Sequence, residues 1–507
     1  MADASDAAIF GPSKAALAFL AEAHGQLIGE AFVEGRGETL IEVEDPATEQ
    51  VIAKVRASSA EDLDQAVAAA RKAFKGWSRT SGADRARIML RFADLLERDA
   101  DKLAEIETLE NGMPIALSGA TIKGFCADYV RYYAGLATKL EGSTIPARAN
   151  GREALDLLVY TVREPVGVVG AIVPWNVPVS MIILKLAPAL ASGCTLVLKS
   201  AEVTPLTSIL VARLWLEAGG PPGVFNLIHG LGHEVGAALV SHPGVDKITF
   251  TGSTAVGKEI VRAVSHDLKR VTLELGGKSP FVIFPDADLA DAIPSAAMAC
   301  FFLSGQNCMA GTRLFVHEKV LEPVLEGLAQ TAAYLKVGPG LDPTTMIGPL
   351  VSARQKGRVL EHVEAAAAEG ARLAYAGGVP AGPGHYVAPT IYADVTPDMR
   401  LAREEVFGPV LGVQSFGDDD EALLSAINAT TYGLSGSVWT RDLSRAHRMA
   451  RAIDSGQVGV NIHAALSPET PFGGNRQSGW GREFGREGID SYLKTKAVSV
   501  NLGVIPA

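Results

Sequence analysis

Residues 166–230 read VGVVGAIVPWNVPVSMIILKLAPALASGCTLVLKSAEVTPLTSILVARLWLEAGGPPGVFNLIHG. Short β-branched or apolar runs in this stretch are separated by longer segments that have helical spacing. Gly193 follows the first helical segment, at a position where helices commonly end. Strands that are apolar throughout and alternate with helices are typical of a parallel sheet covered on both faces. The stretch therefore predicts an α/β fold built on such a sheet.

The same alternation continues to residue 284. The runs expected to form strands are 166–174, 195–200, 224–230, 247–252, 271–277 and 280–284. A helix is expected to begin at the Ser253–Thr254 cap. The apolar tract from Val166 to Leu198 could suggest a membrane span, but three prolines, Asn176 and Lys185 interrupt it. A strand, a helix and a second strand explain these breaks better.

Composition indicates a soluble globular enzyme that acts on small molecules. The chain has 507 residues, of which 48% are apolar and 20% charged, a length that usually holds two or three domains. Its net charge of −11 argues against a nucleic-acid surface, which would normally be basic. No signal peptide and no membrane span are expected.

The four cysteines, Cys126, Cys194, Cys300 and Cys308, are too few for a disulfide framework. Their wide spacing, without a CxxC pair or clustered histidines, makes a zinc site unlikely to form, so no metal is expected. A reducing, cytoplasmic location is the natural expectation.

Two helical regions, a second α/β unit and two strands without a sheet partner complete the expected organisation. Residues 58–77 and 81–112 read as amphipathic helices, and the second of these regions is expected to split in two. A second α/β unit follows Pro280 and runs to about residue 480. The segments ALDLLVYTVREPVG (154–167) and LKTKAVSVNLG (493–503) read as strands without a partner in either sheet. They are expected to form an arm that pairs across subunits.

Residues that could bind a nucleotide lie at the ends of the expected strands. The dinucleotide fingerprint GxGxxG is absent, and Pro174–Asn176 stands in its place. A glycine-bearing turn with Gly252 and Ser253 follows the fourth strand, where it could hold a pyrophosphate or serve only tight packing. Lys199 and Glu202 follow the second strand; they could bind a ribose, or form a surface lysine and a helix start.

Glu274 and Cys308 are the candidate reactive groups. Glu274 lies in the apolar run VTLELGG, where a carboxylate could be a buried ion pair, an edge position or a general base with a raised pKa. Cys308 lies 308 − 274 = 34 residues later, in GQNCMAGTR. Taken alone, this cysteine fits packing better than nucleophilic catalysis.

Eight motifs in order resemble the aldehyde dehydrogenase superfamily. They are PWNVP, LKSAEVTPLT, GGPPGVFNLIHG, FTGSTAVGK, ELGGKSP, FFLSGQNCMAGTR, REEVFGPV and TPFGGNRQSGWGRE. They cover nearly the whole chain, from about residue 25 to 500. The resemblance implies a Rossmann-type cofactor domain (1–141 and 164–277), an α/β catalytic domain (278–485) and a β-strand oligomerisation arm (142–163 and 486–507).

The resemblance also implies roles for single residues. The catalytic set is Cys308 as nucleophile, Glu274 as the base that activates water, Asn176 as an oxyanion donor, and Lys199. The implied mechanism passes through a thiohemiacetal and a thioester. NAD is the implied cofactor, with NADP less favoured because Glu202 would repel a 2′-phosphate. The implied cofactor-binding residues are Trp175, Lys199, Glu202, Gly252, Ser253, Val256, Leu275, Glu405 and Phe407.

Departures from the family pattern bear on the substrate. Val177 and Leu466 stand where many relatives carry aromatic residues, and Leu303 replaces a common Asn. The expected pocket residues are Val177, Met181, Leu184, Phe302, Asn307, Met309, Leu466 and Phe472. Their apolar walls predict an aryl or medium-chain aldehyde, phenylacetaldehyde-like, rather than a semialdehyde or aminoaldehyde.

Two other functions remain open at this level. A CoA-acylating dehydrogenase would keep the fold but use another acceptor, although such relatives tend to lack the glutamate base. A catalytically silent structural or binding protein is the second alternative, against which the intact Asn176, Lys199, Glu274 and Cys308 speak. The small-molecule aldehyde is the expected partner, and a homodimer or homotetramer is the expected assembly.

Overall fold

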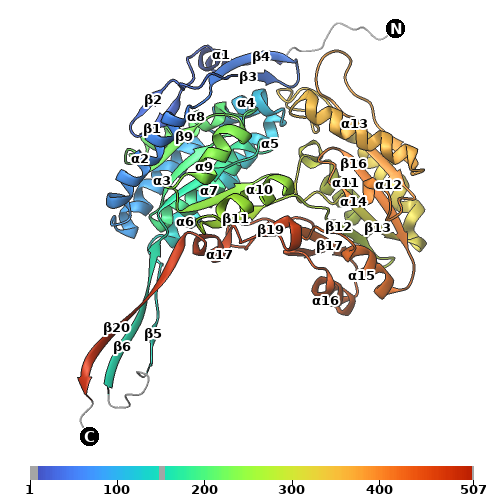
Figure 1. Cartoon of the computed structure of the whole chain (residues 1–507). Helices are drawn as coiled ribbons and strands as arrows, with labels where there is room; N and C mark the ends of the chain where they lie inside the picture. Colours follow the sequence, from blue (N-terminus) through green and yellow to red (C-terminus); the bar gives the residue numbers. More distant parts are fainter. Residues whose placement is uncertain (1–9, 148–154, 505–507) are drawn as a thin grey trace.

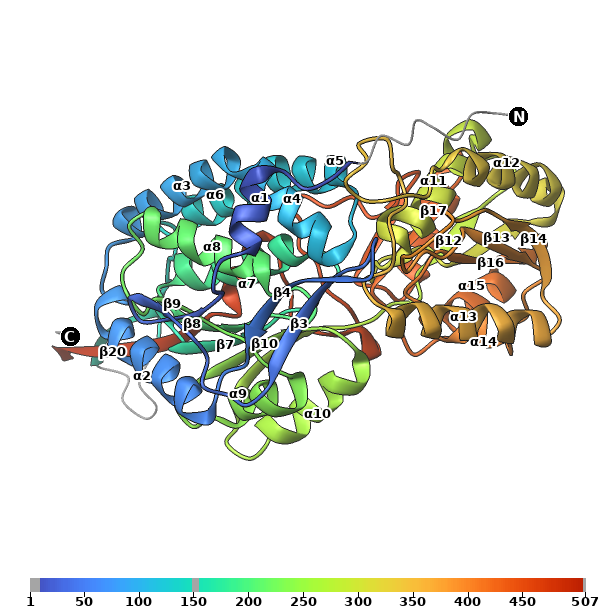
Figure 2. The same cartoon turned by 90° about the horizontal axis from the view of Figure 1, so that it is seen from above.

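The computed structural model describes residues 10–147 and 155–504, which form two α/β lobes side by side and a projecting arm (Figures 1 and 2). Residues 1–9, 148–154 and 505–507 lie outside the described residues. The first range belongs to the predicted cofactor domain, and the other two belong to the predicted arm. Within the described ranges, none of the helices is both long enough and apolar enough to cross a membrane.

The first lobe contains an eight-stranded sheet whose central strands are parallel, as the alternation predicted. Its order is β19-β11-β10-β7-β8-β9-β1-β2. The strands are β19 (Gly479–Trp480), β11 (Arg270–Glu274), β10 (Lys247–Thr251), β7 (Val168–Ile172), β8 (Thr195–Lys199), β9 (Phe225–Ile228), β1 (Gln26–Ile28) and β2 (Ala31–Val33). The chain runs from β7 outward through β8 and β9, then returns to place β10 on the other side of β7. This reversal creates a switch point between β7 and β10, where open α/β sheets bind ligands.

Helices cover both faces of this sheet because its strands are apolar on both sides. One face packs against α3 (Gly82–Arg98), α4 (Ala100–Asn111), α6 (Ala127–Leu136), α7 (Pro178–Ser192) and α8 (Leu206–Glu217). The other face packs against α2 (Ala60–Trp77), α9 (Ala237–Ser241) and α10 (Thr254–Val264). The region 81–112 is split between Arg98 and Ala100, as predicted, and α7 ends at Gly193 in the left-handed conformation.

The second lobe contains a seven-stranded sheet of the same kind, with the order β14-β15-β16-β13-β12-β17-β18. Its strands are β14 (Arg372–Ala376), β15 (Thr390–Ala393), β16 (Val410–Phe416), β13 (Arg313–His317), β12 (Pro280–Ile283), β17 (Ser435–Trp439) and β18 (Gln457–Val460). Its helices include α11 (Leu289–Phe301), α12 (Leu321–Tyr334), α13 (Ala353–Ala368), α14 (Arg400–Arg403), α15 (Asp420–Asn428) and α16 (Leu443–Ala452). The chain then crosses back, since β19 pairs with β11 of the first sheet.

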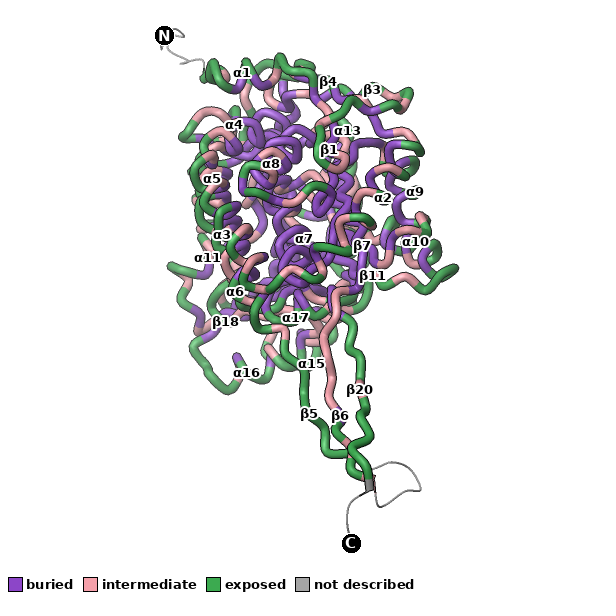
Figure 3. The backbone as a smooth tube through the Cα atoms, turned by 90° about the vertical axis from the view of Figure 1, so that its left-hand side faces the viewer, coloured by how far each residue is buried: buried purple, intermediate pink, exposed green. Residues whose placement is uncertain are grey.

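The two strands without a partner in either sheet pair with each other. Strand β20 (Leu493–Val504) runs antiparallel to β6 (Leu155–Pro165), and β5 (Thr144–Ile145) pairs with the other edge of β6. The three strands project from the first lobe; β5 and most of β20 are exposed, whereas most of β6 is half-buried (Figure 3). A small hairpin of β3 (Leu40–Asp45) and β4 (Gln50–Arg56) lies apart from both sheets.

Candidate active site

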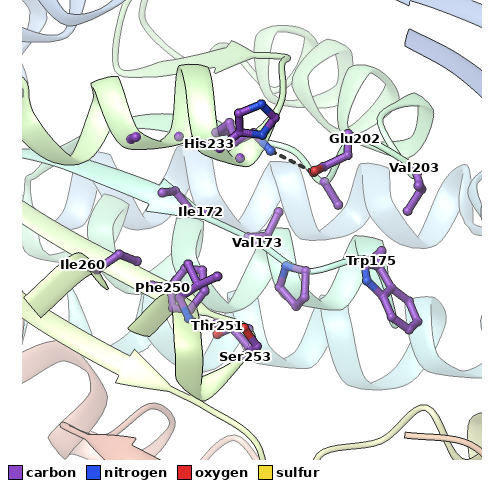
Figure 4. A pocket seen from close by; sticks show the side chains of 18 of the residues that line it. Ile172, Val173, Trp175, Glu202, Val203, His233, Phe250, Thr251, Ser253 and Ile260 are labelled. Carbon is purple, nitrogen blue, oxygen red and sulfur yellow. Dashed lines mark hydrogen bonds and ion pairs between the residues drawn. The ribbon is translucent and has the colours of Figure 1, made fainter. Parts of the chain in front are cut away.

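A cavity of about 570 Å³ lies at the carboxyl ends of β7 and β10, at the switch point of the first sheet. Residues 172–175 line it after β7, and Thr251 and Ser253 line it after β10. Figure 4 shows Glu202 and His233 along one side and Ser253 along the other. The lining from α9 and α10 is largely apolar and consists of Ala237, Val240, Ser241, Val256, Glu259, Ile260 and Ala263. The cavity thus joins an apolar slot between two helices to polar groups at the strand ends.

Lys199 and Glu202 face each other in this cavity. The Lys199 Nζ donates to Glu202 Oε2 at 3.1 Å. Burial lowers the pKa of Lys199, whereas the charge of Lys199 holds the pKa of the partly buried Glu202 carboxyl below its usual value against the opposing effect of burial. The backbone N–H of Gly232 also favours the Glu202 carboxylate. Glu202 is therefore ionised and held in place by two donors.

The turn after β10 begins helix α10. Ser253 is its N-cap, and the Ser253 Oγ accepts a hydrogen bond from the Val256 N–H at 3.4 Å. The Gly252 N–H donates to the Glu274 carbonyl at 3.0 Å, which ties this turn to the end of β11. The N-terminus of α10 therefore faces the cavity, and a helix N-terminus favours an anionic ligand.

Part of the cavity wall comes from the second lobe. Val351, Ser352 and Gln355 line it, and the Gln355 Nε2 donates to the Phe407 carbonyl at 2.9 Å. Phe407 also packs edge-on against Trp175, with 5.3 Å between the ring centroids. The cavity therefore lies between the two lobes.

Three of the predicted cofactor residues lie outside the cavity lining. Leu275 belongs to the apolar cluster under α10. Phe407 contacts the cavity lining through Trp175 and Gln355. Glu405 accepts a hydrogen bond from the Gly277 N–H at 2.9 Å, and burial raises its pKa to about 7. These groups extend the site from the cavity toward Cys308.

The loop before Cys308 is strained and firmly anchored. Leu303, Ser304 and Gly305 all have positive φ angles, of 54°, 57° and 72°. A leucine in this region is uncommon and costs conformational energy. The Asn176 Nδ2 donates to the Gln306 carbonyl at 3.0 Å, and the Gln306 Oε1 accepts from the Val351 N–H at 3.0 Å. The predicted oxyanion donor therefore lies against the nucleophile loop.

Two glycines of ELGGKSP allow the approach of groups from the second lobe. A Cβ atom on Gly276 would lie 2.3 Å from the Glu405 carboxylate, and one on Gly277 would lie 2.3 Å from the Cys308 carbonyl oxygen. Both distances are shorter than atoms tolerate. The backbone after Glu274 thus packs directly against the Cys308 and Glu405 segments.

Cys308 differs from the other cysteines in exposure. All four are free, but only Cys308 is half-buried, whereas Cys126, Cys194 and Cys300 are buried. Burial and the carboxyl groups of Glu405 and Glu274 raise the pKa of the Cys308 thiol to about 12. The backbone N–H groups of Cys308 and Met309 act in the opposite direction. Cys308 is therefore the least buried of the four cysteines, and its thiol needs activation.

Glu274 is buried at the end of β11. Within the described residues, neither oxygen of its carboxyl group has a hydrogen-bond partner. Burial and the charge of Glu483 raise the pKa of Glu274 well above its usual value, while Lys185 lowers it. The carboxyl is therefore a strong base once it loses its proton, as the sequence suggested for a charged residue in an apolar strand.

Lys185 and Glu483 form an ion pair beside Glu274. Lys185 lies on α7 and is fully buried, and Glu483 is nearly so. Sequence analysis did not assign either residue to the site. The signal was present, because a lysine inside the apolar helix 178–192 needs a buried partner.

The predicted aldehyde pocket is only partly assembled around the nucleophile. Leu184, Met309 and Phe472 belong to the apolar cluster against which Cys308 and Met181 pack. Val177, Phe302 and Asn307 are half-buried, and the Asn307 Oδ1 accepts from the Met309 N–H at 3.1 Å. Leu466 is 37% exposed, on a surface loop. The pocket is thus apolar near Cys308, with Leu466 farther out.

Comparisons with known proteins agree on one family. The family model described as "Aldehyde dehydrogenase family" matches residues 32–498. The aldehyde dehydrogenase of Enchytraeus buchholzi is 44% identical over 478 residues, which cover 93% of this chain and 95% of that protein. The NAD⁺ complex of an aldehyde dehydrogenase from Bacillus cereus is 43% identical, has a TM-score of 0.94 and covers 97% of this chain and 99% of its own. A solved indole-3-acetaldehyde dehydrogenase with NAD⁺ is 40% identical, has a TM-score of 0.91 and covers 95% and 97%.

Proposed function

The chain belongs to the aldehyde dehydrogenase family and is an NAD-dependent aldehyde dehydrogenase. From this premise we propose that it oxidises a hydrophobic, aryl or medium-chain aldehyde to the carboxylic acid through covalent catalysis by Cys308. The observation that carries the proposal is the convergence of Cys308, Asn176 and Glu274 beside a nucleotide-sized cavity that lies between the two lobes.

The cavity residues fit a dinucleotide. The apolar slot between α9 and α10 suits an adenine ring, Lys199 and Glu202 suit ribose hydroxyls, and the N-terminus of α10 suits a pyrophosphate. The ionised Glu202, fixed by Lys199, favours NAD over NADP because a 2′-phosphate beside this carboxylate would be repelled. Trp175, Glu405 and Phe407 would then hold the nicotinamide end, next to Cys308.

The first step joins the aldehyde to the protein. The Cys308 sulfur attacks the carbonyl carbon, and the carbonyl oxygen becomes an oxyanion. One N–H of the Asn176 side chain already donates to Gln306, which leaves its second N–H for the oxyanion, together with the backbone N–H of Cys308. When bound, NAD accepts a hydride, and the loss of that hydride converts the thiohemiacetal on Cys308 into a thioester.

The second step releases the acid. Glu274 takes a proton from water, the resulting hydroxide adds to the thioester carbon, and the C–S bond breaks to release the acid and return Cys308 to its thiolate, while the proton stays on Glu274. The raised pKa of Glu274 makes it a strong base for this task. The Lys185–Glu483 pair beside it provides polar groups that can pass the proton on.

The apolar surroundings of Cys308 support a hydrophobic substrate. Met181, Leu184 and Phe472 lie in the cluster around the nucleophile, and the one charged residue of α7, Lys185, is paired with Glu483. The described residues of α7 therefore offer no unpaired cation to bind the carboxylate of a semialdehyde. The solved relative named for indole-3-acetaldehyde, an arylacetaldehyde, agrees with an aryl preference.

The test compares three variants with the parent. Cys308→Ala should abolish acid formation from phenylacetaldehyde plus NAD, whereas Cys300→Ala, which changes a buried cysteine, should keep it. Glu274→Gln should retain a first burst of NADH and then stall at deacylation. Acid formation by Cys308→Ala at the parent rate, or an unchanged steady state in Glu274→Gln, would refute the mechanism. A panel of aldehydes compared by kcat/KM tests the substrate class.

The arm supports a homodimer or homotetramer. It exposes apolar side chains on β5, β6 and β20, namely Ile145, Leu158, Val500 and Leu502. Among the described residues, strand β20 has no partner along its outer edge, which suits pairing with a second copy. Leu158→Asp combined with Leu502→Asp should reduce the molar mass measured by light scattering, and an unchanged mass would argue against this surface.

We assign cofactor binding to the first lobe and catalysis to the second. A reducing cytoplasm suits an enzyme that needs a free thiol.

A further inference from the structure

His463 ties a surface loop to the nucleophile segment. It lies in the loop that follows β18, and its Nε2 contacts the Met309 carbonyl oxygen at 2.9 Å. Its Nδ1 contacts the Ser437 Oγ at 2.8 Å, and Ser437 in turn accepts from the Trp439 Nε1 at 3.4 Å. The imidazole thus bridges β17 and the residue directly after Cys308.

The chemistry of these contacts fixes the tautomer of His463. A carbonyl oxygen can only accept, so the Nε2 carries the proton and donates it to Met309. The Nδ1 of the neutral ring then accepts from the Ser437 hydroxyl, and burial, which lowers the pKa of His463, favours this neutral form. Because both ring nitrogens are engaged, His463 is not free to act as the general base of the reaction.

The loop that carries His463 is held in an unfavourable conformation. Asn461 and Ala464 have positive φ angles of 51° and 50°. Asn461 is anchored by two hydrogen bonds with the backbone of Thr440, each at 3.0 Å, and the Ala465 carbonyl accepts from the Gln457 side chain at 2.8 Å. Strain of this kind persists only where the surroundings enforce it, and it concentrates at functional sites.

A contact with Met309 can affect the Cys308 thiol. Its N–H is one of the two backbone donors that favour the Cys308 thiolate, and it also donates to Asn307. The Met309 carbonyl shares a peptide plane with the Ala310 N–H, which donates to the Asn307 carbonyl at 3.0 Å. Holding this plane from both sides restrains the short turn 307–310 and with it the direction of the Met309 N–H. Leu466, the outer residue of the predicted aldehyde pocket, lies three positions after His463 in the same loop.

We propose that His463 is a positioning residue: its bond to the Met309 carbonyl sets the reactivity of Cys308 and couples the aldehyde-side loop 461–466 to the nucleophile. The inference rests on the proposed role of Cys308. A histidine with a purely structural role would affect the stability of the protein and leave the reactivity of the Cys308 thiol unchanged. The reactivity of this thiol therefore distinguishes a positioning role from a structural one.

The experiment uses two variants that divide the functions of the ring. In His463→Gln the side-chain amide nitrogen matches the Nε2 and can still reach Met309. In His463→Asn it matches the Nδ1 and cannot. The alkylation rate of Cys308 by iodoacetamide is measured on the full chain without cofactor, by mass analysis of the peptide that contains Cys308.

We expect the rate constant to fall about three- to tenfold in His463→Asn, the effect of one buried hydrogen bond, and to stay within about twofold in His463→Gln. Equal rates in the parent and the Asn variant, or equal losses in the two variants, overturn the proposal. If His463→Asn does not fold, Ser437→Ala, which removes the partner of the Nδ1, should slow alkylation in the same direction, and an unchanged rate overturns the proposal. Aldehyde oxidation by the parent is assayed separately, so its absence would count against the proposed function alone.

Discussion

The Lys185–Glu483 ion pair gives the sharpest prediction, because its two members act on Glu274 with opposite signs. Glu483 raises the pKa of Glu274, and Lys185 lowers it. Glu483→Gln removes the first effect and frees Lys185 to pair with Glu274. Glu274 should then ionise at lower pH. Lys185→Met removes the stabilising charge and should make Glu274 ionise at higher pH.

The magnitude follows from burial. Lys185 is fully buried and Glu483 is 7% exposed, so solvent screens their charges little. A charge close to a buried carboxyl typically shifts its pKa by about one to three units. The acid limb of the turnover–pH profile should move down by that amount in Glu483→Gln and up in Lys185→Met. The plateau should fall in Glu483→Gln, since a carboxylate of lower pKa is a weaker base.

The assay is steady-state turnover from about pH 5 to pH 10, under conditions in which a burst of NADH shows that deacylation limits the rate. Lys185→Met should also lose about 3–5 kcal/mol of stability because it leaves the buried Glu483 unpaired, whereas Glu483→Gln should lose less because Lys185 can pair with Glu274; Tm is measured in parallel. The double variant, which removes both charges, and Lys54→Met, which breaks the exposed pair with Glu42, serve as controls. Shifts in the same direction for both single variants, or no shift, would refute the electrostatic coupling.

Three shorter predictions concern other parts of the site. Asn176→Ala should reduce kcat about 10²–10³-fold with an unchanged NAD dissociation constant by calorimetry, and a loss of NAD binding instead would contradict an oxyanion role. Glu202→Gln should raise kcat/KM for NADP relative to NAD by about tenfold, whereas an unchanged ratio would mean that Glu202 does not set the preference. Gly277→Ala places a Cβ 2.3 Å from the Cys308 carbonyl oxygen, so kcat should fall about 10²-fold; a parent-like kcat would show that the loop can yield.

The sequence predicted the features that depend on neighbouring residues. The strand–helix alternation gave the parallel sheet, and Gly193 and Ser253 marked the helix ends that the structure contains. Lys199 and Glu202 could be paired from sequence because they lie three residues apart at a strand end. The switch point itself depends on the order of strands, which the alternation does not specify.

Contacts between distant segments were beyond this reasoning. Lys185 and Glu483 are 298 residues apart, and Met309 and His463 are 154 apart. Each of these side chains also has an ordinary local explanation, such as a helix face or a loop. Only the folded chain shows that each pair meets beside the predicted nucleophile or base. The exposure of Leu466 likewise depends on where its loop lies, whereas its place in the family pattern and its apolar character predicted a pocket wall.

The mutual influence of Cys308 and Glu274 gives the proposed reaction its order. The carboxyl of Glu274 contributes to the raised pKa of the thiol, and electrostatic coupling is reciprocal, so ionisation of either group opposes ionisation of the other. While Cys308 carries the thiolate charge, Glu274 is driven toward its protonated form and cannot activate water. Once the sulfur is acylated it is neutral, and its opposition to the ionisation of Glu274 ends, whereas burial and Glu483 continue to raise the pKa of Glu274. The base therefore becomes available when a thioester is present to hydrolyse, and the same pair of groups serves attack and release in sequence without competing.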